Sequence, residues 1–122
     1  MKEVISAGNT NAPYSPAIRA GNFVFVSGQL PTSPETGAIE ADTIAAQTRQ
    51  SLENVGAVLK LCGLTYSDVV KTTVFLTDMS KFAEMNSVYT EFFSSEAPAR
   101  SAIQVVALPK GAMVEIEAIA TK

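Results

Sequence analysis

The residues best suited to chemistry are an arginine and two glutamates near the end of the chain. Arg100 precedes an apolar run, and Glu115 and Glu117 lie inside a second apolar segment. Residues two apart point to the same side of an extended strand, so the two carboxylates share one face. Carboxylates in so apolar a strand should line a site or a barrel interior, or pair across an interface. A guanidinium has the fork geometry that holds a small carboxylate. Together these groups suggest a pocket that binds an anionic substrate and moves protons beside it.

The composition narrows the chemistry further, because the chain has no histidine and a single cysteine, Cys62. This argues against a transition-metal site. It also removes the Ser-His and Cys-His nucleophilic systems. Acid–base catalysis would then depend on Glu, Asp, Tyr, Lys or Cys. Cys62 falls on an apolar helical stripe and is expected in the core.

Length and charge define the general class of protein. The 122 residues predict a single domain, 1–122, that buries a core without disulfides. The net charge is −3 and the basic residues are scattered, so we expect no nucleic-acid partner. No apolar run approaches the ~20 residues that span a bilayer, and the short, mixed start is unlike a signal peptide. We therefore expect a cytoplasmic protein with no membrane partner.

Hydrophobic periodicity predicts the order β, β, (β), α, β, α, β, β. Residues 9–16, rich in Asn and Pro, are predicted to form a loop. Asp42 is a candidate cap for the first helix, and Asp78 or Ser80 for the second. The clearest segments are strands at 22–28, 69–77, 101–108 and 113–121, and helices at about 42–62 and 80–93.

Two helices can cover only one face of such a sheet. The other face still carries apolar side chains, among them Phe75 and Ile103 or Val106, beside the glutamates. An exposed apolar sheet of this kind indicates association with copies of the same chain. A closed ring of sheets around an axis would bury it.

The last two strands are predicted to pair as an antiparallel hairpin that turns near Lys110. Glu115 then pairs close to Val105, and Arg100 lies about five residues away along the strand, or ~16 Å. This is too far for both groups to hold one substrate of three or four carbons. Arg100 and Glu115 of one site are therefore expected to come from neighbouring chains, unless the hairpin is irregular.

Short segments along nearly the whole chain resemble the RidA family (also called the YjgF/YER057c/UK114 family) of enamine/imine deaminases. Each segment is weakly specific alone, but their order and spacing are highly specific. They are PYS (13–15), VSGQLP (26–31), QTRQSLENV (47–55), VKTTVFLTDM (70–79), FAEMNSVY (82–89), PARS (98–101) and VEIE (114–117).

The resemblance implies an α+β, chorismate-mutase-like fold, with a mixed β-sheet and two helices on one face. It implies a homotrimer with a central β-barrel and active sites between subunits. The implied reaction is hydrolysis of 2-aminoacrylate and its 2-imino tautomers, or of 2-iminobutanoate, to 2-oxo acids and ammonia. No metal and no organic cofactor is implied.

The positions that the family uses fall on six residues here. Arg100 would bind the substrate carboxylate, and Glu115 would position and deprotonate water. Many members carry cysteine where this chain has Ala102, which bears on substrate preference more than on reaction class. The implied site residues are Tyr14, Ser27, Gly28, Asn86, Arg100 and Glu115.

Each residue also has a structural interpretation, and the function has rivals. Arg100 could bridge to a glutamate at an interface, and Glu115 and Glu117 could form a solvated face. Asn86 could satisfy backbone groups, and Ser27 is a strand-end hydroxyl.

The protein could also use the implied site to sense 2-oxo acids without turnover. Some relatives are described as ribonucleases or translation inhibitors, but an acidic chain without a basic, aromatic surface argues against RNA.

Overall fold

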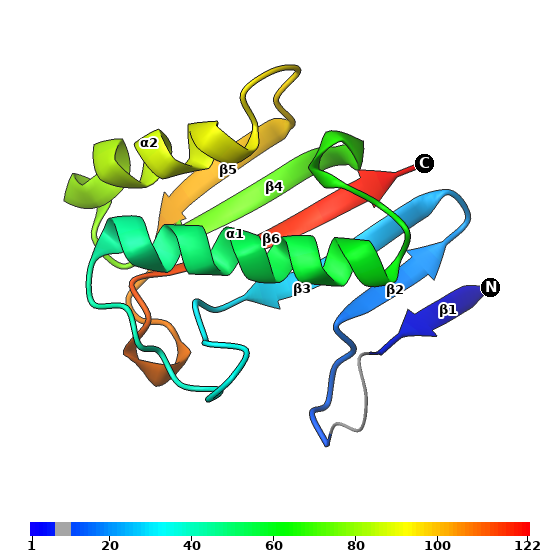
Figure 1. Ribbon diagram of the computed structural model, residues 1–122, viewed down its shortest axis with the longest axis horizontal. Coiled ribbons are helices and arrows are strands. Elements are labelled where there is room, and N and C mark those ends of the chain that lie inside the picture. Colours follow the sequence, from blue (N-terminus) through cyan, green and yellow to red (C-terminus); the bar gives the residue numbers. More distant parts are fainter. Residues whose placement is uncertain (7–10) are drawn as a thin grey trace.

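The computed structural model describes residues 1–6 and 11–122, and in these residues two helices lie across one face of a six-stranded sheet (Figure 1). The α+β class and the covered face are therefore as predicted. The strand order is β1-β2-β3-β6-β4-β5. No helix in the described ranges is long and apolar enough to cross a bilayer. The elements are β1 (Lys2–Ile5), β2 (Ala17–Ala20), β3 (Phe23–Gln29), α1 (Ile44–Leu61), β4 (Val69–Leu76), α2 (Phe82–Phe92), β5 (Ala99–Gln104) and β6 (Val114–Thr121), with short 3-10 turns at Tyr66–Asp68, Met79–Lys81 and Pro109–Gly111.

Helix α1 begins and ends at local sequence signals. The Thr43 hydroxyl accepts a hydrogen bond from the Ala46 amide at 3.1 Å, so the N-cap is Thr43 and not Asp42 as predicted. Gly63 follows the helix with a φ of 74°, the left-handed conformation that ends many helices. The side of α1 that faces the sheet is apolar, and its most buried side chains are Leu52, Val55 and Leu59.

Helix α2 follows a 3-10 turn that Asp78 caps by accepting a hydrogen bond from the Ser80 amide at 3.0 Å. Met85 and Tyr89 face the sheet and are buried. The hydroxyls of Tyr89 and Thr72 lie 2.6 Å apart in a buried hydrogen bond, which fastens α2 to β4. The predicted second helix is thus present, with a separate turn at its start.

The predicted hairpin of the last two strands is wrong. β4 lies between β5 and β6, pairs with β5 in parallel and pairs with β6 antiparallel (Figure 1). The physical reason is that β4, α2 and β5 form a crossover unit, since parallel strands need a long connection such as a helix. Residues 105–113 then carry the chain past β4 to the start of β6. The sheet is mixed, as the resemblance implied.

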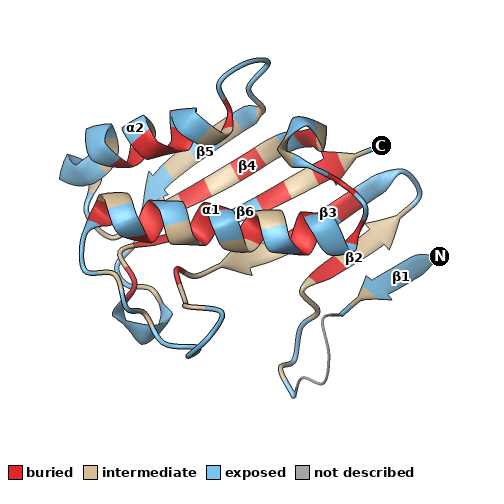
Figure 2. Ribbon diagram, viewed as in Figure 1, coloured by how far each residue is buried: buried red, intermediate tan, exposed pale blue. Residues whose placement is uncertain are grey.

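Alternation along β4 and β6 separates the two faces of the sheet. Thr72, Val74 and Leu76 are buried beneath the helices. Strict alternation would place Val70 on the same face, but Val70 is 41% exposed at an irregularity in the pairing of β4 with β6. In β6 the residues that flank the glutamates, Val114, Ile116 and Ala118, are buried, and Figure 2 shows this alternation as bands along the strand. The uncovered face carries exposed Phe23, Phe25 and Ile103.

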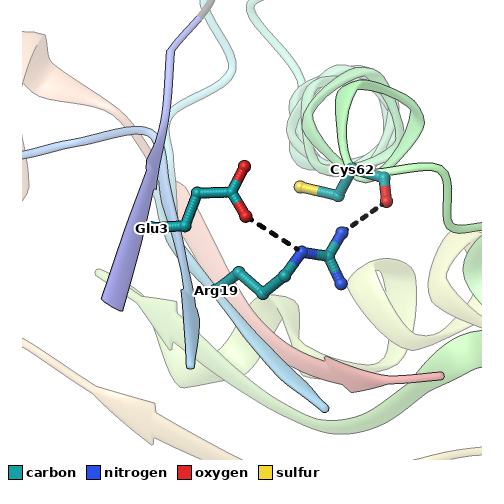
Figure 3. A network of polar contacts seen from close by, with 3 residues as sticks. All are labelled: Glu3, Arg19 and Cys62. Atoms are coloured by element: carbon teal, nitrogen blue, oxygen red, sulfur yellow. Dashed lines mark hydrogen bonds and ion pairs between the residues drawn. The ribbon is translucent and has the colours of Figure 1, made fainter. Parts of the chain in front are cut away.

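The first two strands are tied to the end of α1 by one arginine (Figure 3). Arg19 Nη2 donates a hydrogen bond to the Cys62 carbonyl at 2.7 Å, and Arg19 Nε lies 3.8 Å from Glu3 Oε1. A cation here satisfies a helix-terminal carbonyl and complements the helix dipole. The Cys62 side chain belongs to the core, as predicted, and burial raises the pKa of its thiol. Of the loop predicted at 9–16, residues 9 and 10 lie outside the described ranges, and 11–16 form no helix or strand.

Candidate active site

A cavity of about 330 Å³ opens where β3, β6 and the loop before β2 meet. It brings together four of the six residues that the resemblance implied, from segments far apart in the sequence. Both charged and apolar groups contact the same space, which suits a small polar ligand. The lining residues are Tyr14, Ser27, Gly28, Leu30, Pro109 and Glu115.

The carboxylate of Glu115 lies directly against the backbone of Gly28. A Cβ atom added at Gly28 would overlap Oε2 of Glu115 and would lie 2.8 Å from its Cδ atom. Only glycine leaves this space open, since it has no side chain. Gly28 thus allows a carboxylate to sit beside the backbone of β3, at the wall of the cavity.

Ser27 holds the loop that carries Tyr14. Its hydroxyl donates a hydrogen bond to the Ser15 carbonyl at 2.6 Å, and its amide donates to the Pro16 carbonyl at 3.0 Å. The Tyr14 side chain is 64% exposed at the cavity mouth. Ser27 therefore acts here as a strand-end hydroxyl that positions a loop, one of the two roles considered from the sequence.

The environment of Glu115 favours its protonated form. Burial raises the pKa of Glu115, and the neighbouring carboxylate of Glu117 raises this pKa further. Both glutamates lie on the sheet face away from the helices, as the alternation predicted. A carboxyl group with a raised pKa can take up and return a proton nearer neutral pH than an ordinary glutamate can.

Arg100 and Asn86 form a second cluster, between α2 and β5. Arg100 Nη1 donates a hydrogen bond to Asn86 Oδ1 at 2.7 Å. The guanidinium carbon lies 4.6 Å from the ring centroid of Tyr89 and 5.4 Å from that of Phe82. These contacts fix the guanidinium plane at the wall of a cavity of about 360 Å³. That cavity is lined by Asn86, Tyr89, Thr90, Phe93, Ala97, Pro98 and Arg100.

Arg100 and Glu115 of one chain lie on opposite faces of the sheet. Arg100 is in register with Thr72, and Glu115 with Phe75. Positions three apart along β4 point to opposite sides. Neither cavity is lined by both residues. Arg100 and Glu115 are thus apart because they lie on opposite faces of the sheet, whereas the predicted hairpin separated them by distance along the strand. That they meet across two chains stays a prediction.

Two polar residues of α1 shape the cavity wall and had no role in the sequence-based interpretation. The Ser51 hydroxyl donates a hydrogen bond to the Gln29 carbonyl at 2.6 Å. Asn54 Nδ2 donates to the carbonyls of Leu30 and Thr32, both at 2.9 Å. These bonds satisfy backbone carbonyls at the end of β3 and in the loop that leaves it.

The side chain of Gln47 joins the segment before α1 to the start of β6. Its Nε2 donates a hydrogen bond to the Ala41 carbonyl at 2.9 Å, and its Oε1 accepts one from the Met113 amide at 2.8 Å. Gln47, Ser51 and Asn54 are four and then three apart, so they follow one side of a helix. Polar residues at this spacing beside a buried stripe were the signal that could have identified them.

Known proteins match the chain along its length. The model of the endoribonuclease L-PSP family matches residues 4–122. A RutC family protein of Pyrococcus horikoshii is 52% identical, over 100% of this chain and 99% of its own. The 2-iminobutanoate/2-iminopropanoate deaminase of Escherichia coli is 44% identical, over 100% and 99%. Reactive Intermediate Deaminase A of Arabidopsis thaliana is 48% identical, over 98% of this chain and 66% of its own.

Solved structures share the same fold. The YjgF gene product of Escherichia coli superposes with a TM-score of 0.91 at 44% identity, covering 98% of each chain. TdcF of Escherichia coli, with bound serine, gives a TM-score of 0.88 at 45% identity, covering 98% of this chain and 96% of its own. The chain therefore belongs to the endoribonuclease L-PSP family, which is the family of the YjgF and RidA proteins.

Proposed function

We propose that this protein hydrolyses small 2-enamino and 2-imino acids, such as 2-aminoacrylate and 2-iminobutanoate, to 2-oxo acids and ammonia. The observation that carries the proposal is the Glu115 carboxyl group, which has a raised pKa and lies against Gly28 at the wall of a cavity. The names of the Escherichia coli and Arabidopsis relatives, at 44% and 48% identity, support the same reaction class.

The reaction needs one proton acceptor and a positioned water. On the imine tautomer, Glu115 takes a proton from water as the oxygen bonds to the carbon of the C=N group, and passes that proton to the nitrogen, which gives a tetrahedral carbinolamine. The Glu115 carboxylate then takes the hydroxyl proton of the carbinolamine and passes it to the nitrogen, the C=O bond forms as the C–N bond breaks, and ammonia and the 2-oxo acid leave. Imines hydrolyse readily in water, so positioning and one base account for much of the catalysis.

Arg100 binds the substrate carboxylate with two parallel hydrogen bonds. Its bond to Asn86 and its contacts with Tyr89 and Phe82 hold the guanidinium ready before the substrate arrives. Because Arg100 and Glu115 line different cavities on opposite sheet faces, we propose that each site combines the two from neighbouring chains. The arrangement is a homotrimer in which the uncovered sheet faces form a central barrel.

Mixing two inactive variants tests the shared site. Arg100→Ala and Glu115→Gln are each expected to abolish acceleration of 2-oxobutanoate release when a threonine dehydratase generates 2-iminobutanoate in situ. If the two are unfolded and refolded together, random mixing in a cyclic trimer leaves about a quarter of the sites with both groups intact. Activity should return to that fraction of the wild-type value.

Each alternative predicts a different result. A site within one chain would give no recovery in the mixture. Binding of 2-oxobutanoate by the wild-type protein without faster hydrolysis would favour a sensor. RNA cleavage, which the family's name raises, would appear as salt-sensitive degradation of RNA that survives the Arg100→Ala substitution.

A further inference from the structure

A second cavity, of about 400 Å³, adjoins the one that holds Glu115. The two share Tyr14, Gly28 and Leu30, and Pro109 of the first neighbours Lys110 of the second. A substrate of three or four carbons fills only part of this combined space. The second cavity is lined by Tyr14, Pro16, Gly28, Gln29, Leu30, Thr32, Gly37, Val58 and Lys110.

Below, the cavity that holds Glu115 is called the inner cavity and the second one the outer cavity. Lys110 gives the outer cavity its charge. It is the one charged residue among the lining residues of the second cavity. Arg19 and Arg49 make the ion pairs of the described residues, and Lys110 takes part in neither. Lys110 Nζ donates a hydrogen bond to the Gly37 carbonyl at 2.9 Å. An ammonium group has three N–H donors, so further donors are available to a ligand.

The backbone at Lys110 is unusual for a residue with a side chain. Its φ is 61° and its ψ is 19°, and Gly111 follows with a φ of 69°. Glycine adopts this left-handed conformation without strain, whereas other residues do so at a cost and often at functional sites. The lysine side chain therefore contributes something that glycine could not, and its bond across to Gly37 directs it over the outer cavity.

One role for Lys110 is simply to fasten the loop that contains Gly37. That role depends on the hydrogen bond to the carbonyl and would affect every substrate alike. A cation at the wall of a cavity otherwise free of charged residues has a second consequence, because it favours an anionic group there. The two roles differ in whether the effect depends on the charge of the ligand.

We propose that Lys110 binds a second anionic group at the far end of the substrate, so that the site prefers 2-imino acids whose side chain ends in a carboxylate. This rests on the proposed function, and the reaction is the same: water adds to the C=N carbon, ammonia leaves, and a 2-oxo dicarboxylic acid forms. The carbon chain would extend from Glu115 in the inner cavity toward Lys110 in the outer one.

The test compares two five-carbon substrates that differ only in their terminal group, 2-iminoglutarate and 2-iminopentanoate. An amino-acid oxidase with catalase generates them from glutamate and norvaline. Lys110→Met keeps the length of the side chain and removes its charge. It should raise KM for 2-iminoglutarate about tenfold, leave kcat nearly unchanged and alter KM for 2-iminopentanoate by less than about twofold. Lys110→Arg should restore the preference.

The control is Lys60→Met, because Lys60 is exposed on the last turn of α1 and lines neither cavity. It should change neither substrate's KM. Equal losses for both substrates in Lys110→Met would overturn the proposal in favour of a fastening role. No loss for either substrate would overturn the proposal as well.

A binding measurement separates this inference from the proposed function. Calorimetry should show that the wild-type protein binds 2-oxoglutarate more tightly than 2-oxopentanoate, and that Lys110→Met removes the difference. If this holds while no imine is hydrolysed, the anion subsite stands and the deaminase assignment falls. Equal affinities for the two 2-oxo acids overturn the subsite, whether or not hydrolysis occurs.

Discussion

At the scale of single residues, Glu115 and Gly28 depend on each other. The absence of a side chain at residue 28 creates the space that the carboxylate occupies, and the partly buried position raises the pKa of that carboxylate. A raised pKa means that ionisation is less favourable in the folded chain than in the unfolded chain. The group proposed to act as base is thus placed at some expense of stability.

Glu115→Gln should therefore stabilise the protein at neutral pH while it abolishes deamination. The folded-state pKa of Glu115 lies above the ordinary value of 4.5 for a glutamate, so its favourable contribution is present below that value and is lost as pH rises through the folded pKa. The melting temperature of the variant should match the wild type near pH 4 and exceed it near pH 7. A difference that does not change with pH would contradict this account, and wild-type activity should rise over the same window.

At the scale of elements, polar residues on α1 hold the loop that forms the cavity wall. Ser51 and Asn54 satisfy three carbonyls, one on the last residue of β3 and two in the segment that follows it. The helix thus supports the site as well as the core. Its polar contacts fix the position of the residues that line both the inner and the outer cavity.

Asn54→Ala should lower the free energy of unfolding by about 1–3 kcal/mol, because it leaves two partly buried carbonyls without their donor. Urea denaturation measures this loss. Glu53→Ala is the matched control, because Glu53 is exposed on the same helix, and its effect should stay within about 0.5 kcal/mol. Similar losses in both variants would show that a general effect of substitution on α1, and not the contact of Asn54 with the loop, explains the result.

The sequence predicted the elements better than their pairing. Period-two alternation placed Glu115 and Glu117 on one face, and the apolar stripe of α1 identified its buried side, because both patterns are local. The neighbours of β5 and β6 depend on the crossover through α2, which no local pattern records. The contact of the Lys110 side chain with Gly37 was not predicted for a similar reason, since it joins segments far apart in the sequence.

At the scale of the whole molecule, the sheet has one covered and one apolar uncovered face. Phe23 and Phe25 are 48% and 44% exposed, and their ring centroids lie 6.5 Å apart. Ile103, on β5, is 46% exposed. Clustered aromatic and aliphatic groups of this kind are typical of surfaces that bind another chain. The proposed trimer buries them around its axis.

Phe25→Glu should convert the trimer to monomers, because it places a charge in the interface that the proposal assigns to the uncovered face. Light scattering should show a threefold lower mass, and deaminase activity should fall with it. Leu61→Glu serves as the comparison, since Leu61 is an exposed apolar residue of α1, on the other side of the sheet. A Phe25→Glu protein that keeps its mass would rule out this interface.

Because Arg100 and Glu115 lie on opposite faces of the sheet, the proposed shared site makes activity depend on protein concentration. Under that proposal, a single chain offers a small acid either the guanidinium or the carboxylate, but not both at one site. Specific activity should then collapse on dilution below the concentration at which chains assemble, although every chain remains folded. Under the proposed shared site, turnover is governed by the mass action of assembly, and newly made chains are expected to be inactive until they associate.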